Sequence, residues 1–118
     1  MTKKHSERLP LAPATLHILL ALAGEELHGY GIMQEVERQS GGCYKLGPGT
    51  LYDNLQRLLG EGLVEEVKRA GGEDSRRRYY RLSSLGRGVL REEIARLEGV
   101  VRDGRLRLGS TKTRTAPA

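Results

Sequence analysis

Residues 48–82, PGTLYDNLQRLLGEGLVEEVKRAGGEDSRRRYYRL, decide the fold because the spacing of their hydrophobic residues changes part of the way along. Up to Gly60 the leucines recur at three- and four-residue intervals, which predicts an amphipathic helix. These leucines are Leu51, Leu55, Leu58 and Leu59. A proline near the start and glycines at the end are typical helix boundaries, so we expect the helix to open at residues 47–50 and to end near Gly60.

After Gly62 the pattern becomes that of a β-hairpin. Residues 63–69 carry valines among charged residues, and residues 77–82 contain two adjacent tyrosines, so both segments favour strands. Residues 70–75 lie between them, include two glycines and predict the turn.

Two helices are predicted before residue 48 and one after residue 82. Residues 13–23 are apolar on nearly all sides, which indicates a buried helix, and residues 29–39 are amphipathic. The last helix is expected to begin at Ser83-Ser84, a good capping pair, and to run to about Asp103. Its apolar residues step by four, three and four, as in a coiled-coil seam. They are Leu90, Ile94, Leu97 and Val101.

This order of elements predicts a mainly α-helical chain with a small β-hairpin, namely a winged helix-turn-helix followed by a C-terminal dimerisation helix. We expect a winged-helix DNA-binding domain at residues 11–83 and a dimerisation helix at 84–108. A flexible basic arm is expected at 1–10 and a disordered tail at 109–118. A chain of 118 residues is one domain in size and gains stability from a partner subunit. We therefore expect a homodimer held by the seam of the last helix and by part of the first helix. The residues of the first helix are Leu16, Leu19 and Leu20.

The excess of basic residues indicates a polyanionic partner. The chain has 20 Lys and Arg against 15 Asp and Glu, a net charge of +5. Six of the basic residues fall within residues 68–81, where two acidic residues oppose them. Arginines beside a glycine-containing turn fit against phosphates or into a minor groove. We therefore expect double-stranded DNA as the partner, contacted by Arg76, Arg77 and Arg78.

The polar face of the helix at residues 48–60 is the second candidate DNA contact. Asn54 can hydrogen-bond a base edge, and Arg57 can reach a guanine or a phosphate. Thr50 lies at the helix N-terminus, where free backbone N–H groups suit a phosphate. An ordinary solvated helix face would carry the same residue types, so these residues taken alone leave that alternative open.

No pattern in the sequence predicts an enzyme, a metal site or a cofactor. His5, His17 and His28 are far apart and lack ligand-like spacing, and Cys43 is the single cysteine. The longest apolar stretch is about half the length that a membrane span needs, so we expect a cytoplasmic protein without a membrane anchor.

Four short motifs occur in an order that resembles one family. They are His28-Gly29-Tyr30, Pro48-Gly49-Thr50-Leu51-Tyr52, Arg57-Leu58 with Gly62-Leu63-Val64, and Tyr79-Tyr80-Arg81-Leu82-Ser83 leading to Gly86. Over roughly residues 16–90 the chain resembles the PadR family of bacterial transcriptional regulators, in its short-tailed subgroup.

The resemblance implies a homodimer that represses target promoters from a pseudo-palindromic operator, often released by a small phenolic or drug-like effector. It implies that Tyr52 touches a phosphate, that Asn54 and Arg57 face the groove, and that Arg76 to Arg78 lie along the backbone or minor groove. Some members hold flat drugs between tryptophans, but this chain has no Trp and no Phe. Two alternative functions remain: a winged-helix module that binds another protein, and a dimer that sequesters a small molecule.

Overall fold

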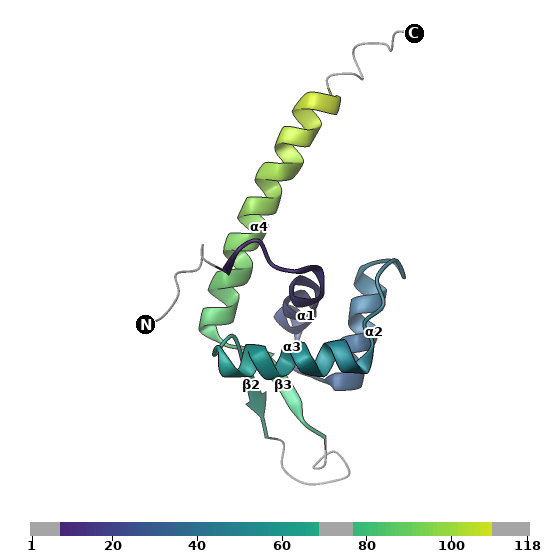
Figure 1. The fold of residues 1–118 in the computed structure, drawn as a ribbon, viewed down its shortest axis with the longest axis vertical. Helices are drawn as coiled ribbons and strands as arrows, with labels where there is room; N and C mark the ends of the chain where they lie inside the picture. Colours follow the sequence, from purple (N-terminus) through teal and green to yellow (C-terminus); the bar gives the residue numbers. More distant parts are fainter. Residues whose placement is uncertain (1–7, 69–76, 110–118) are drawn as a thin grey trace.

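The computed structural model describes residues 8–68 and 77–109 (Figure 1). The elements follow in the order α1 (Pro13–Gly24), β1 (Leu27–His28), α2 (Gly29–Gln39), α3 (Pro48–Gly60), β2 (Val64–Val67), β3 (Tyr79–Leu82) and α4 (Ser84–Gly104), with a π-helical turn at Arg105–Gly109. The predicted mainly helical architecture, with a small antiparallel sheet and a long last helix, is confirmed. The expected turn at 70–75, residues 1–7 of the arm and residues 110–118 of the tail lie outside the described residues.

The sheet has three strands where the sequence predicted two. β3 is central, with β2 on one side and the two-residue strand β1 on the other. Leu27 and His28 of β1 pair with Tyr80 and Tyr79 of β3. A two-residue strand is too short to show an alternating pattern, so no local spacing predicts it.

The hydrophobic core forms around α1, which packs against α2, α3, α4 and β3. Ile18, Leu19 and Leu22 of α1 are fully buried and meet the predicted leucine stripe of α3. The expectation that Leu19 belongs to a dimer interface is corrected here, because its side chain is 0% exposed within one chain. Leu16 and Leu20 are only partly buried on the same helix.

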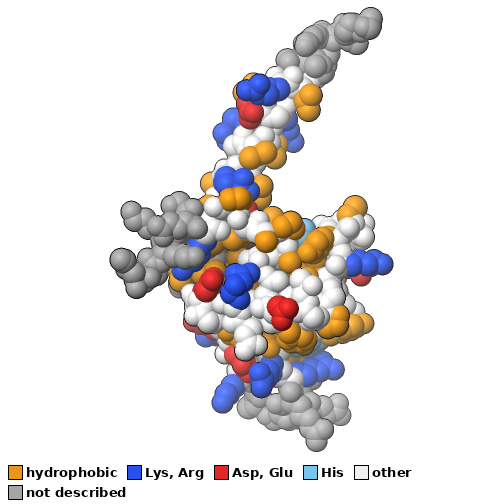
Figure 2. All heavy atoms as spheres, in the orientation of Figure 1, with side chains coloured by type: hydrophobic (Ala, Val, Ile, Leu, Met, Phe, Trp, Pro, Cys, Tyr) orange, Lys and Arg blue, Asp and Glu red, His pale blue; other side chains and the backbone are white. Residues whose placement is uncertain are grey.

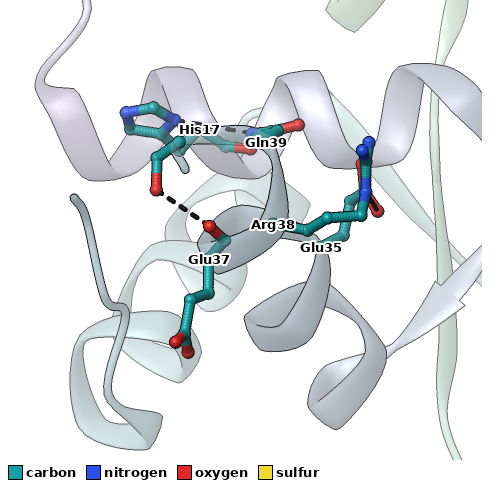
Figure 3. A network of polar contacts seen from close by, with 6 residues as sticks. His17, Glu35, Glu37, Arg38 and Gln39 are labelled. Carbon is teal, nitrogen blue, oxygen red and sulfur yellow. Dashed lines mark hydrogen bonds and ion pairs between the residues drawn. The ribbon is translucent and has the colours of Figure 1, made fainter. Parts of the chain in front are cut away.

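The C-terminal end of α2 is tied to α1 by a side-chain amide. Gln39 Nε2 donates to the backbone carbonyl of His17 at 3.0 Å (Figure 3). The His17 ring stacks on Tyr44, which precedes α3, with ring centroids 4.8 Å apart. These contacts fix how α2 and the segment leading into α3 lie against the first helix.

The start of α4 packs closely against the backbone of Leu63, which follows α3. Ser83 caps it by accepting a hydrogen bond from the Gly86 backbone N–H at 2.9 Å, and the Ser83 N–H donates to the Leu63 carbonyl at 3.1 Å. A Cβ on Gly86 would lie 2.0 Å from that same carbonyl oxygen. Glycine at this position is therefore what allows so close an approach.

The rest of α4 projects away from the domain (Figure 1). Its first half buries Val89 and Leu90, so Leu90, expected in the dimer seam, belongs instead to the core of its own chain. Beyond Glu93 the apolar side chains are uncovered, and hydrophobic groups are visible along the projecting helix (Figure 2). They include Ile94, Val100, Val101, Leu106 and Leu108, while Leu97 is partly buried.

A buried carboxylate marks the change between the two halves of α4. Glu93 is 0% exposed, accepts a hydrogen bond from the Leu11 backbone N–H at 3.0 Å and ion-pairs with Arg96 at 2.6 Å. The Arg96 guanidinium lowers the pKa of this carboxyl, against the effect of burial, and the Leu11 N–H lowers it further. Leu9 also packs on the core, so the inner end of the expected arm lies against the domain.

Candidate nucleic-acid interface

Helix α3 has one face in the core and three kinds of surface around the rest of it. Leu51, Leu55 and Leu58 face inward. The side directly opposite is exposed and carries Asp53 and Gln56 between glycines. The two flanking edges carry the predicted contact residues, and they differ in how those side chains are bonded.

On one edge the side chains form a closed hydrogen-bond network with α1. Thr15 Oγ1 donates to Asn54 Oδ1 at 2.7 Å and accepts from Arg57 Nη2 at 2.9 Å. Arg57 Nη2 also donates to Asn54 Oδ1 at 2.8 Å, and Asn54 Nδ2 donates to the Thr50 carbonyl at 2.9 Å. Both polar atoms of Asn54 are therefore engaged within the protein.

This network changes the interpretation of the two predicted base-reading residues. A bidentate contact to adenine needs the amide oxygen and nitrogen of Asn54 together, and both already have partners. Arg57 is 48% exposed and its Nη1 lies 3.7 Å from Glu61, so it keeps donors at the surface. Thr15 is buried on α1, and sequence reasoning missed it because a threonine inside an apolar helix carries no distinguishing pattern.

On the other edge, Tyr52 is half-exposed and lies over the start of α2. A Cβ on Gly29 would lie 2.1 Å from the Tyr52 hydroxyl oxygen, so the glycine makes room for the ring. The ring borders a groove of about 670 Å³ that also contacts Tyr30 and Tyr80. Burial and the nearby Glu66 raise the pKa of Tyr80, so its phenol is neutral at pH 7 and adds no negative charge.

His28 also lines this groove and caps α2. Its Nδ1 accepts the Gly31 backbone N–H at 3.0 Å, and its ring meets the Tyr79 ring edge-on at 5.3 Å. Arg77 Nη1 lies 3.2 Å from its Nε2. The sequence did not predict this role for His28, because the cap and the approach of Tyr79 and Arg77 depend on tertiary structure.

The basic residues of the wing, the β2–β3 hairpin, are not equally available. Arg81 lies 2.9 Å from Glu65 and 3.8 Å from Glu26, while Arg78 is 74% exposed and lies 3.8 Å from Glu66. The register places Glu65 opposite Arg81 across the sheet. Acidic residues outside residues 68–81 therefore offset part of the positive charge that the basic residues of this segment carry. Arg76 lies outside the described residues.

Basic side chains lie in two parts of the molecule. One group surrounds the end of the domain where the strands lie, and others lie along the projecting α4 (Figure 2). Thr50 is exposed at the start of α3.

In the described ranges, no group of three or more His, Cys, Asp or Glu side chains could hold a metal ion. No helix within 8–68 and 77–109 has the length and apolarity to cross a membrane.

Comparison with known proteins gives consistent results. A model described as the transcriptional regulator PadR-like family matches residues 18–92. The transcriptional regulator Rv3488 of Mycobacterium tuberculosis is 40% identical over 93 residues, which cover 78% of this chain and 82% of the relative.

Solved structures share the fold. A PadR family transcription regulator from Clostridium difficile R20291 superposes with a TM-score of 0.70 at 20% identity, over 82% of this chain and 99% of that one. Bacillus subtilis PadR in complex with operator DNA superposes with a TM-score of 0.63 at 24% identity, over 72% of this chain and 48% of that one.

Proposed function

Because the chain belongs to the PadR-like family of transcriptional regulators, we propose that it binds operator DNA as a homodimer and represses transcription. The observation that carries this proposal is the family match over residues 18–92, which spans both edges of α3 and the wing. The related Bacillus subtilis PadR was solved on operator DNA, which supports the same ligand for this chain. A regulatory role for this family also argues against an enzyme.

We assign DNA binding to residues 11–83. Helix α3 would enter the major groove with its exposed face, and Arg57 would supply a donor to a base or phosphate. Thr50 and Tyr52 would contact phosphates near the start of α3. The wing arginines, Arg76 to Arg78, would follow the backbone or minor groove. Asn54 takes a supporting part, since it holds Arg57 against Thr15.

We assign dimerisation to residues 84–108, with a second copy of this chain as the occupant of the uncovered apolar stripe. Ile94, Leu97 and Val101 line one groove of about 580 Å³ on α4, and Leu106 continues it. Leu16 and Leu20 of α1 are the partly exposed residues expected to join the interface. Two-fold symmetry would set the two α3 helices into successive major grooves, about 34 Å apart, on a pseudo-palindromic site.

A small aromatic or drug-like effector would act through the same dimer region. A second apolar groove of about 280 Å³ lies where α4 leaves the domain, lined in part by Ala23, Leu90 and Ile94. A ligand there would touch both the DNA-binding domain and the dimer helix, and so could change the angle between them. Because the chain has no Trp or Phe, its contacts would be aliphatic rather than a tryptophan stack.

The proposal is tested by fluorescence anisotropy with the protein's own upstream intergenic DNA and a scrambled duplex, at two salt concentrations. We expect tighter binding to the native duplex and a steep loss of affinity with salt. Equal or absent binding to both duplexes would contradict the proposal and favour the protein-interaction alternative.

Variants sharpen the same assay. Arg57→Ala should lower operator affinity by about 1–3 kcal/mol and relax specificity at one base pair if Arg57 reads a base. The matched control is Arg107→Ala, which removes the same charge near the far end of α4, where Arg107 pairs with Asp103. Equal losses in the two variants would show a general charge effect instead of base recognition.

A further inference from the structure

Nitrogen atoms of His28 and Arg77 lie next to each other in the groove beside α2. A backbone N–H can only donate, so the bond from Gly31 requires His28 Nδ1 to be unprotonated. A neutral imidazole with a bare Nδ1 carries its proton on Nε2. The cap of α2 therefore sets the tautomer of the ring.

The group facing that Nε2–H is also a donor. Arg77 Nη1 lies 3.2 Å from Nε2, and a guanidinium has no acceptor. Neither group can accept from the other, whereas an oxygen atom with several lone pairs can accept from both. The pair thus presents a charge-assisted site for an oxyanion.

The surroundings favour the same kind of ligand. The groove is bordered by the hydroxyl-bearing rings of Tyr30 and Tyr52 and by the N-terminus of α2, an 11-residue helix. Helix N-termini attract anions through their free N–H groups and dipole. The basic Arg78 lines this groove as well.

The imidazole is held in place before any ligand arrives. β1 pairs His28 with Tyr79 in the sheet, the Tyr79 ring packs against the imidazole, and the cap bond fixes its rotation. A donor that is already fixed loses little conformational entropy when it binds.

We propose that His28 Nε2 and Arg77 form a built seat for a phosphate group, and that the DNA backbone supplies this phosphate. The choice of DNA as the source rests on the proposed function. The seat lies between the wing and the start of α2, so it would clamp the duplex at the side of α3 opposite the Thr15 network.

The variant that tests the seat is His28→Asn. Asparagine is a strong N-cap, so it keeps an acceptor for the Gly31 N–H but has no group in the place of Nε2. We expect unchanged thermal unfolding and about tenfold weaker operator binding, with an unaltered salt slope because a neutral donor is lost. Arg77→Gln should weaken binding and also reduce the salt slope by about 0.9.

The double variant tests whether both residues hold one phosphate. If they do, His28→Asn should cost much less affinity in the Arg77→Gln background than in the parent chain. His28→Ala loses both the cap and the donor, whereas His28→Asn loses only the donor. The drop in thermal stability of His28→Ala relative to His28→Asn therefore measures the loss of the cap, separately from the loss of the phosphate contact. Operator affinity of His28→Asn equal to that of the parent would overturn the proposal.

Imidazole ¹⁵N NMR of the full chain gives a test that does not depend on operator binding. We expect a protonated Nε2 and a bare Nδ1, and a shift of the Nε2–H signal on addition of operator DNA. A proton on Nδ1 would overturn the seat. If the chain fails to prefer operator DNA, the proposed function fails, and titration with inorganic phosphate then decides the seat alone. A shift would support a free anion as the occupant, and no shift would overturn the site.

Discussion

The two halves of α4 have the same kind of apolar spacing but different surroundings. In the half from Ser84 to Glu93, Gly86, Val89 and Leu90 are buried against the rest of the chain. In the half from Ile94 to Gly104 the apolar side chains are exposed or, for Leu97, only partly buried, with Val101 at 48%. Hydrophobic periodicity therefore predicts which side of a helix will be buried. It does not predict whether that side packs against the same chain or against another chain.

The same substitution, glycine to alanine, can be made in each half, and Gly86→Ala should give the larger effect. The new Cβ would lie 2.0 Å from the Leu63 carbonyl oxygen, a backbone atom that cannot swing aside. It would also disturb the Ser83 N–H bond to that oxygen. We expect a loss of about 3 kcal/mol in the free energy of unfolding, measured by urea denaturation. A loss below about 0.5 kcal/mol would show that α4 does not seat as closely as described.

A second prediction concerns the uncovered half. Replacing both Ile94 and Val101 with Asp should weaken dimerisation at least about a hundredfold, near 2.7 kcal/mol, because the interface would have to bury two charges from each subunit. Sedimentation equilibrium measures the dimer constant, and circular dichroism should show that the monomer stays folded.

The matched control for the stripe is Val100→Asp. Val100 is 56% exposed on the same helix but does not line the groove that contains Ile94 and Val101. It should leave the dimer largely intact. Dissociation by Val100→Asp and not by the double variant would place the interface on a different side of α4.

The sequence predicted the helix order, the bounds of α2 and the hairpin, because each has a strong local signal: a periodic stripe, a glycine stop or a tyrosine-rich strand. It placed Leu19 at a dimer interface because the first helix is apolar on nearly all sides, and it placed Leu90 there because that residue fits the seam of the last helix. Only tertiary packing shows that both are fully or almost fully enclosed by their own chain.

The candidate site was predicted in outline but not in its bonding. The residues on α3 and the wing arginines were found from residue type and position. Thr15 and His28 were not, because each acts through a partner about 40 or more residues away in the sequence. Such long-range contacts leave no mark on local spacing.

A third prediction concerns Glu93, at the boundary between the halves. Glu93→Gln keeps an acceptor for the Leu11 N–H but removes the ion pair with Arg96, and we expect a loss of about 2 kcal/mol at pH 7. The folded-state pKa of Glu93 lies below its unfolded value of about 4.3, so its stabilising effect is full above that pH and is lost as pH falls through the folded-state pKa.

The difference in unfolding free energy between parent and Glu93→Gln should therefore shrink as the pH is lowered from 7 toward 3. Denaturation at several pH values measures it, with Glu98→Gln on the exposed half as the control. A difference that is constant over this range would mean that the charge of Glu93 adds nothing to stability.

The smallest effect is expected for Gly99→Ala, the counterpart of Gly86→Ala. No atom beyond its own helix backbone and chain neighbours lies within 4 Å of a Cβ at Gly99, and the residue is in the middle of a helix. Alanine there should stabilise α4 by about 0.5–1 kcal/mol through its higher helix propensity. Thermal unfolding of a monomeric background carrying the Ile94 and Val101 substitutions measures this gain alone. If Gly99 faces solvent in the parent dimer, Gly99→Ala should raise the stability of the dimer by the same amount. If Gly99→Ala instead lowers the stability of the dimer but not that of the monomer, the partner's backbone lies against Gly99, and the interface extends further around the helix.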